Sequence, residues 1–215
     1  MQKTHYLLVL TIAAVVPAAA ADDTAARIDK SVAVLNKMTE SRHGIPAAKL
    51  ANADCIAVIP GFKKGAAVVG AGYGRGFISC RNGNGWSTLG AITLETGSLG
   101  VQVGGEEIDI VVLSVDKEKR SKLLSERFAV GSDASAAWGN GKTAHEDPNA
   151  QILFYGHTKG AFAGFGLDGA TLKADHSTDK TLYGKELPNS QIVAEEKTPA
   201  VAQSLVEKLD RVTPR

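Results

Sequence analysis

The chain contains 215 residues, of which 24 are lysine or arginine and 23 are aspartate or glutamate, and its formal net charge is +1 at pH 7. A balance this close to neutral argues against a nucleic-acid-binding protein, whose domains are usually strongly basic. The length suits one domain that buries roughly 70% of the surface that its unfolded chain exposes.

Residues 1–21 have the layout of a secretory signal peptide. Lys3 precedes an apolar run over residues 6–16, which is followed by a proline and four alanines. A membrane anchor is the weaker alternative, because the run is shorter than the about 20 residues that cross a hydrocarbon core. We expect cleavage near Ala20 or Ala21. Since no cysteine stands there to carry a lipid, the expected location is periplasmic or secreted.

Residues 22–44 are predicted to form an amphipathic helix. Its apolar residues recur at spacings of three and four, and Gly44 and Pro46 end the pattern. These apolar positions are Ile28, Val32, Leu35 and Met38. We expect this face to cover the sheet. The alternative, a helix lying on a bilayer, is weaker because the polar face is mixed in sign and the apolar face is small. A short helical turn is expected at residues 45–50.

The stretch from Cys55 to Gly105 is the centre of the predicted fold. Short apolar runs rich in valine and isoleucine alternate with glycine-containing turns, a pattern typical of consecutive antiparallel strands. A helix is disfavoured, because each interior glycine costs about 1 kcal/mol relative to alanine. The Asn-Gly repeat at residues 82–85 predicts a tight turn. Strands are expected at residues 56–59, 66–71, 77–81, 86–94, 98–103 and 108–115.

The remaining elements continue the same mixture of helices and strands. Asp116 is the predicted N-cap of a surface helix reaching Glu126. Strands at residues 151–157 and 161–167 flank a turn at Lys159, and a helical turn is expected at residues 178–183. Thr198 is expected to cap a last helix that presents Val201, Leu205, Leu209 and Val212 on one face. This order predicts an α+β single domain, with a strongly twisted antiparallel sheet or barrel-like β core flanked by N-terminal and C-terminal helices.

Cys55 and Cys80 are the two cysteines of the chain. Export to an oxidising compartment favours a disulfide between an even pair of cysteines. The alternative is two separately buried thiols.

A series of ordered sequence blocks spans roughly residues 45–185. The blocks are ADCIAVIPG at 53–61, GAAVVG at 65–70, YGRG at 73–76, GWS at 85–87, GSLGVQVG at 97–104, DIVVL at 109–113, GSDASAA at 131–137, KGAFAG at 159–164 and LYG at 182–184. Together they resemble the SYLF domain, a lipid-binding module also called the Ysc84 actin-binding domain. The resemblance implies a lipid-binding domain over residues 45–185, followed by a linker and helix over residues 186–215. It also implies binding of an anionic lipid, phosphoinositides in eukaryotic relatives, without catalysis.

Five basic residues beside predicted glycine turns are the candidate lipid-binding residues. They are Lys63, Lys64, Arg75, Arg81 and Lys159. If the turns gather at one end of the sheet, each cation contributes about 1 kcal/mol toward an anionic surface. The alternative for each is a solvated turn residue. A second hypothesis for the whole chain is a protein partner held by the terminal helices.

No motif in the sequence predicts an enzyme, a cofactor or a metal site. Glycine occupies every second position from Gly70 to Gly76, but a strand follows where a dinucleotide fingerprint requires a helix. On a strand, alternate glycines bare one face and permit tight bending or close approach of another backbone. They would also leave a bare groove where an acyl chain could lie. The histidines lie far apart, and no nucleophile stands beside a base.

Overall fold

The computed structural model describes residues 18–41, 44–65, 71–83, 85–97, 106–130, 134–138, 151–158 and 169–213. The expected leader lies outside these residues as far as residue 17, as do the expected strands at 98–103 and 161–167 and most of the one at 66–71. In the described part of the chain, every helix is too short or too polar to span a bilayer.

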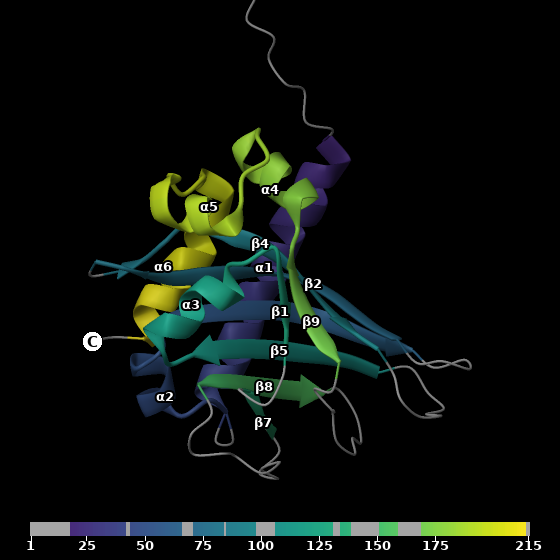
Figure 1. The fold of residues 1–215 in the computed structure, drawn as a ribbon, viewed down its shortest axis with the longest axis vertical. Helices are drawn as coiled ribbons and strands as arrows, with labels where there is room; N and C mark the ends of the chain where they lie inside the picture. The colour runs from purple at the N-terminus through teal and green to yellow at the C-terminus, as the bar shows by residue number, and fades with distance from the viewer. Residues whose placement is uncertain are drawn as a thin grey trace, which may run out of the picture.

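A curled sheet forms the centre of the molecule (Figure 1). Its described strands are β1 Cys55–Gly65, β2 Ala71–Asn82, β3 Gly85–Trp86, β4 Gly90–Thr96, β5 Glu106–Ser114, β6 Arg127–Ala129, β7 Ala134–Trp138, β8 Ile152–Thr158 and β9 Ala170–Ala174. Their order is β6-β9-β4-β2-β1-β5-β8-β7, with β3 paired to β2. Of the described pairings only β7 with β8 is parallel. The predicted α+β class with an antiparallel sheet is therefore confirmed.

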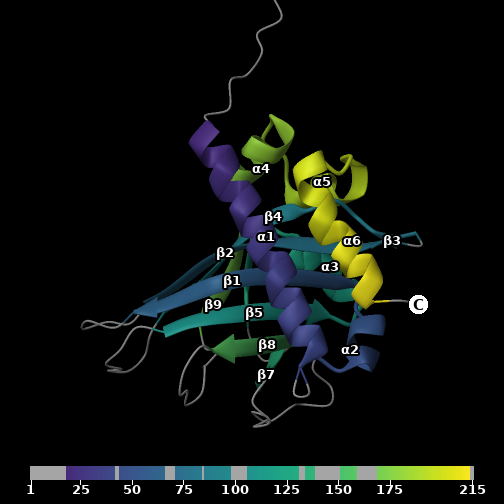
Figure 2. The same ribbon diagram turned by 180° about the vertical axis from the view of Figure 1, so that it is seen from behind.

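Helices cover the sheet on both faces. They are α1 Ala18–Glu40, α2 Ala47–Ala51, α3 Lys117–Leu123, α4 His176–Tyr183, α5 Asn189–Glu195, the 3-10 turn η1 Ala200–Ala202 and α6 Gln203–Val212. Helices α1 and α6 pack against each other on one face (Figure 2), and β9 crosses over the opposite face where the sheet curls. The expected flanking of the β core by N-terminal and C-terminal helices is confirmed.

Alternation along β1 divides the apolar residues between two cores. Ile56 and Val58 point toward α1 and α6, whereas Ala57 and Ile59 point into the curl of the sheet. This follows from the two-residue period of a strand, which sends successive side chains to opposite faces. Both faces of β1 are buried, and its sequence is therefore a continuous apolar run rather than an alternating one.

Pro60 and Gly61 form a bulge inside β1. The expected end of the strand at residue 59, with a glycine turn before Lys63, was therefore wrong. The pairing of β1 shifts register between Val58 and Lys63 against β2, and between Ile59 and Phe62 against β5. Gly61 has φ of +60°, a conformation that other residues rarely adopt. A bulge adds a residue to one strand and bends it, and β1 thereby continues to Gly65 instead of ending at Ile59.

The alternate glycines of β2 leave room for large side chains of β1. This agrees with the prediction that they permit close approach of another part of the chain. A Cβ atom added to Gly72 would lie 2.3 Å from Phe62, and one added to Gly76 would lie 2.1 Å from the Val58 carbonyl oxygen. The bared face is filled by Phe62 and Ile59, each 0% exposed. The suggestion of a bare groove for an acyl chain at this position is therefore wrong.

The C-terminal region differs in detail from the prediction. The last helix begins at Gln203, after η1, and Thr198 does not cap it. Leu205 and Leu209 are buried as expected, but Val201 is 41% exposed. Strand β9 and helix α5 were not predicted, because both are short and neither carries a strong periodic pattern.

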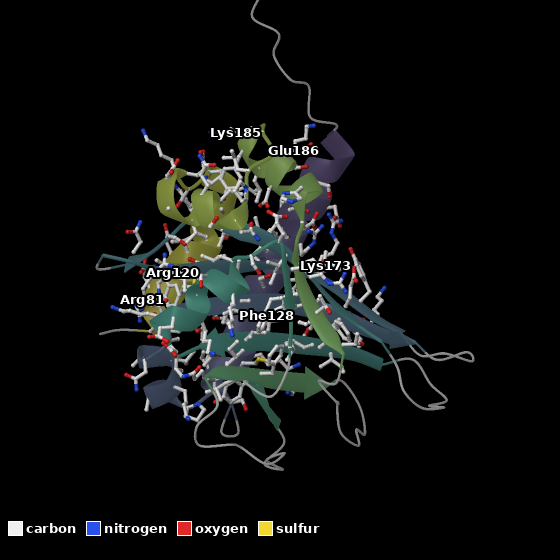
Figure 3. All side chains as sticks on the ribbon, viewed as in Figure 1. Arg81, Arg120, Phe128, Lys173, Lys185 and Glu186 are labelled. Carbon is white, nitrogen blue, oxygen red and sulfur yellow. A yellow bond between two sulfur atoms is a disulfide. The ribbon has the colours of Figure 1, made fainter. Side chains whose placement is uncertain are left out.

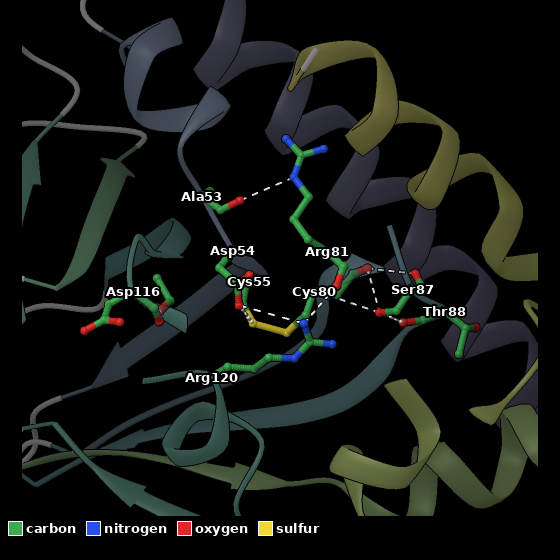
Figure 4. The surroundings of a disulfide bond; sticks show 11 residues. Ala53, Asp54, Cys55, Cys80, Arg81, Ser87, Thr88, Asp116 and Arg120 are labelled. Carbon is green, nitrogen blue, oxygen red and sulfur yellow. Dashed lines mark hydrogen bonds and ion pairs between the residues drawn. A yellow bond between two sulfur atoms is a disulfide. The ribbon is translucent and has the colours of Figure 1, made fainter. Parts of the chain in front are cut away.

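Cys55 and Cys80 form the expected disulfide between paired positions of β1 and β2 (Figure 4). Both sulfur-bearing residues are 0% exposed. Beside them, Arg120 Nη1 donates to the Arg81 carbonyl oxygen at 2.8 Å and lies 3.9 Å from Asp54 Oδ2. The bridge thus joins the central strands at the end of the sheet near the C-terminus (Figures 1 and 4).

Candidate functional site

A groove runs along α1 where this helix crosses β1 and β2, and we call it the α1 groove. It consists of two adjoining hollows of about 380 and 300 Å³, which share Lys30, Pro60, Gly61 and Lys63. The first hollow extends to Lys37, Glu107 and Asp109. The second extends to Asp23, Arg27, Tyr73 and Arg75.

One face of α1 supplies basic residues to the groove. Arg27, Lys30 and Lys37 are spaced by three and seven residues, which places them on one side of a helix with 3.6 residues per turn. Lys37 Nζ lies 3.8 Å from Asp109 Oδ2. Lys30 is exposed, and within the described residues it takes part in no ion pair. Its ammonium group is therefore available to an anion in the groove.

The β1 bulge shapes the floor of the groove. The Gly61 amide donates to Asp109 Oδ1 at 3.1 Å, which fixes the bulge against β5. Beyond the bulge, Lys63 pairs with Tyr73 across β1 and β2. Lys63 is exposed, with no ion pair among the residues that the structure covers, and Tyr73 is 50% exposed. A second free ammonium group and an aromatic ring thus border the same hollow.

Arg75 is held at the groove by helix α4. Its Nε atom donates to Asp175 Oδ2 at 2.8 Å and its Nη2 atom donates to Thr178 Oγ1 at 2.6 Å. Burial alone would raise the pKa of Asp175, but hydrogen bonds from Arg75, Ser177 and Thr178 outweigh burial and lower that pKa. The hydrogen bond to Asp175 in turn raises the pKa of Arg75. Arg75 is therefore a fixed positive charge in a set position.

Asp23 and Arg27 close the end of the groove nearest α4. Arg27 Nη2 donates to Asp23 Oδ2, and Arg75 Nη1 lies 3.7 Å from the same oxygen. The Arg27 side chain is 9% exposed and donates to Thr178 Oγ1 at 3.3 Å. Its Cζ atom lies over the Phe77 ring, 5.8 Å from the ring centre. The Asp23 side chain is 63% exposed. One solvent-facing carboxylate therefore contacts two guanidinium groups.

The structure brings two of the five candidate residues, Lys63 and Arg75, to this groove. Lys64 lies in β1 opposite Gly72, but its side chain, like the whole of Lys159, lies outside the described residues. Arg81 lies at the other end of β2, far from the groove (Figure 3).

Arg81 is engaged within the fold. Its guanidinium lies 4.5 Å from the centre of the Trp86 ring, and its Nη2 atom donates to the Thr213 carbonyl oxygen at 2.7 Å. It is 8% exposed. In this position Arg81 supports the end of α6.

The contribution of α1 to the site was not predicted. Arg27 and Lys30 lie between the apolar positions of the predicted helix, and no site was assigned to them. The spacing of Arg27, Lys30 and Lys37 was a usable signal, because the three side chains share one helix face. What the sequence could not supply was the glycine bulge of β1 that this face meets.

The arrangement of basic side chains in the groove is suited to binding an anion. Within the described ranges, no three histidine, cysteine, aspartate or glutamate side chains are grouped so as to hold a metal ion. The groove instead offers guanidinium and ammonium groups together, which recognise phosphate oxygens through charge-assisted hydrogen bonds.

Comparison with known proteins finds one family. The family model described as "Ysc84: Las17-binding protein actin regulator" matches residues 95–212. The Homo sapiens SH3 domain-containing YSC84-like protein 1 is 29% identical over 199 residues, covering 86% of this chain and 58% of that protein. Protein YSC84 of Saccharomyces cerevisiae is 26% identical over 196 residues, covering 86% of this chain and 42% of that protein.

The chain therefore spans a little over half the length of the SH3 domain-containing relative from Homo sapiens. The aligned part includes most of the curled sheet and its helices, since it takes in 86% of the residues. No solved structure matches the chain.

Proposed function

Because the chain belongs to the Ysc84 family, we propose that it is a non-catalytic protein that binds anionic lipid headgroups at the α1 groove. The ligand is a phosphate-bearing headgroup presented at a membrane surface. Arg75 and Arg27 supply fixed guanidinium groups, and Lys30 and Lys63 supply ammonium groups.

The observation that carries this proposal is that Lys30 and Lys63 line the groove from two different elements. One comes from α1 and the other from β1, both are exposed, and neither forms an ion pair within the described residues. Unpaired cations on opposite walls create a positive potential that a phosphate reduces. Each contributes about 1 kcal/mol near an anionic surface.

Tyr73 supports a membrane location for the ligand. An exposed tyrosine combines an apolar ring with a polar hydroxyl group, and such residues are favoured at the boundary between headgroups and acyl chains. Tyr73 borders the same hollow as Lys30 and Lys63. In this proposal the ring rests among the headgroups while the cations hold the phosphate.

The sequence of residues 1–21 extends the proposal to the cell envelope. A cleaved secretory leader would deliver the protein to the periplasm or the exterior, where an anionic membrane face is available. The competing proposal is a protein partner bound through the terminal helices. It has less support, because the apolar residues Leu35, Leu205 and Leu209 of α1 and α6 are buried in one shared core.

Vesicle sedimentation tests the lipid proposal. The protein is expected to sediment with vesicles containing an anionic phospholipid at low salt and to be released at high salt, because screening weakens exposed charges. The variant Lys30→Glu/Lys63→Glu should lose this binding. The matched control is Lys117→Glu/Lys197→Glu, which reverses two exposed lysines outside the groove that form no ion pair among the described residues.

Equal sedimentation with neutral phosphatidylcholine vesicles would contradict the proposal. Equal loss of binding in the two double variants would also contradict it, because that result would assign the effect to overall charge rather than to the groove.

A further inference from the structure

Asp23 occupies the position in the α1 groove where an anionic ligand would contact two arginines. Its Oδ2 atom accepts a hydrogen bond from Arg27 Nη2 and lies 3.7 Å from Arg75 Nη1. The side chain lines the hollow and is 63% exposed, so it meets solvent on the side from which a ligand would arrive. A carboxylate between two guanidinium groups has the charge and geometry of a bound oxyanion.

The other acids near these arginines do not play the same part. Asp175 is 7% exposed and also accepts a hydrogen bond from the Thr178 amide, so it is built into the start of α4. Asp109 is held by the Gly61 amide and lies near Lys37 in the other hollow. Of these three acids, Asp23 is the one that a ligand can displace without breaking the fold.

We propose that Asp23 is an internal competitor of the ligand and lowers the affinity of the groove for phosphate groups. This inference rests on the proposed lipid-binding function. A phosphodiester carries one negative charge, so its exchange for the Asp23 carboxylate is nearly even for Arg27 and Arg75. A phosphomonoester carries about −1.5 to −2 at neutral pH, and its additional charge faces Lys30 and Lys63. Lys30 and Lys63 therefore favour phosphomonoester over phosphodiester headgroups, whereas Asp23 weakens the binding of both by a similar factor.

The experiment compares Asp23→Asn with Asp29→Asn. Both variants remove one negative charge from an exposed position of α1, but Asp29 lines neither hollow. Binding is measured to phosphatidylcholine vesicles that contain either phosphatidylglycerol, a diester, or phosphatidic acid, a monoester, at matched surface charge. Inorganic phosphate without vesicles is titrated calorimetrically as the free source of the same chemical group. Circular dichroism confirms that each variant is folded.

The wild type is expected to bind phosphatidic acid vesicles more tightly than phosphatidylglycerol vesicles. Asp23→Asn should strengthen binding to each of the two lipids by about fivefold, as the removal of one competing charge implies. Asp29→Asn should change either affinity by less than about twofold, because Asp29 lines neither hollow and its exposed charge is screened.

Equal effects of the two variants, or no effect of either, would overturn the inference while leaving lipid binding in place. If the wild type binds anionic vesicles no better than neutral ones, the lipid function fails. In that case, tighter binding of inorganic phosphate by Asp23→Asn than by Asp29→Asn would still support the competitor role and assign the groove to free phosphate. Absence of phosphate binding as well would overturn both.

Discussion

Arg75 serves the fold and the groove with the same guanidinium group. Replacing it by alanine would leave the Asp175 carboxylate, 7% exposed, without its main partner. We expect Arg75→Ala to lower the free energy of unfolding by about 1–3 kcal/mol, the usual cost of a buried polar group that loses its partner. Urea denaturation measures this, with Lys63→Ala as the control, expected to change stability by less than about 0.5 kcal/mol. Equal stability of the two variants would contradict the expectation.

Asp179 is a buried carboxyl group that gives the fold a pH dependence. It is 0% exposed, its Oδ1 atom accepts from the Ala91 amide at 2.8 Å, and burial raises its pKa to about 7. Since the ordinary pKa of an aspartate is about 4, the folded state binds more protons than the unfolded state between these values. The free energy of unfolding should therefore fall as the pH rises from about 4 to about 7.

We expect Asp179→Asn to flatten this fall, because the amide stays neutral and its oxygen still accepts from Ala91. Urea denaturation at intervals between pH 5 and pH 8.5 measures the slope. His176 acts in the same direction, because its hydrogen bond to Glu126 raises its pKa and the resulting stability is lost as the pH rises. Some slope should therefore remain in Asp179→Asn and become smaller when His176→Gln is added. An unchanged slope in Asp179→Asn would refute the assignment.

At the scale of elements, the close approach of β1 and β2 depends on the glycines of β2. A Cβ atom at Gly76 would lie 2.1 Å from a backbone oxygen of β1, and the strands would have to separate to admit it. We expect Gly76→Ala to lower the free energy of unfolding by about 1–3 kcal/mol or more, and so to lower the melting temperature. Gly97→Ala is the control, because nothing lies within 4 Å of the added methyl group. Similar melting temperatures would contradict the packing described.

The disulfide between β1 and β2 should contribute to stability mainly through the unfolded chain. It closes a loop between residues 25 positions apart, which corresponds to about 3 kcal/mol in the loop-entropy description. The variant Cys55→Ala/Cys80→Ala should have a free energy of unfolding, measured by urea denaturation, that is lower by about that amount. A reducing agent should lower the stability of the wild type but not of the variant. A reducing agent that affects both equally would argue against this origin.

The strands and helices were predictable where one residue pattern was strong. The apolar runs of β1 and β5 and the capping aspartate of α3, whose side chain accepts from the Glu118 amide, are visible in the sequence. The bulge at Pro60 and Gly61 was not, because the same dipeptide is typical of a turn and only pairing with two neighbouring strands keeps β1 extended.

Only some residues of the groove could be predicted from the sequence, because the groove also depends on contacts between distant elements. Lys63 and Arg75 were identified because glycines stand beside them in the sequence. Arg81 has similar neighbours, but β2 is twelve residues long and places its two ends far apart. Lys30 was missed because nothing in α1 itself indicates which part of the sheet its charged face meets.

At the scale of the whole molecule, the first and last described helices stabilise one another. Leu209 of α6 is 1% exposed in the core that it shares with Ile28 and Leu35 of α1, whereas Val201 is 41% exposed. We expect Leu209→Ala to lower the free energy of unfolding by about 2–5 kcal/mol. Val201→Ala should cost less than about 0.5 kcal/mol. Chemical denaturation measures both, and a comparable loss in the two variants would contradict the observed burial.

The contact between α1 and α6 also fixes an order of events during synthesis. About 170 residues separate Leu35 from Leu209, so the apolar stripe of α1 emerges from the ribosome long before α6 has been synthesised. The part of that stripe that α6 covers stays exposed on the nascent chain until α6 has been synthesised, and a chaperone or another holding factor could bind it there. Completion of this core therefore waits for α6, whatever the speed at which the sheet assembles.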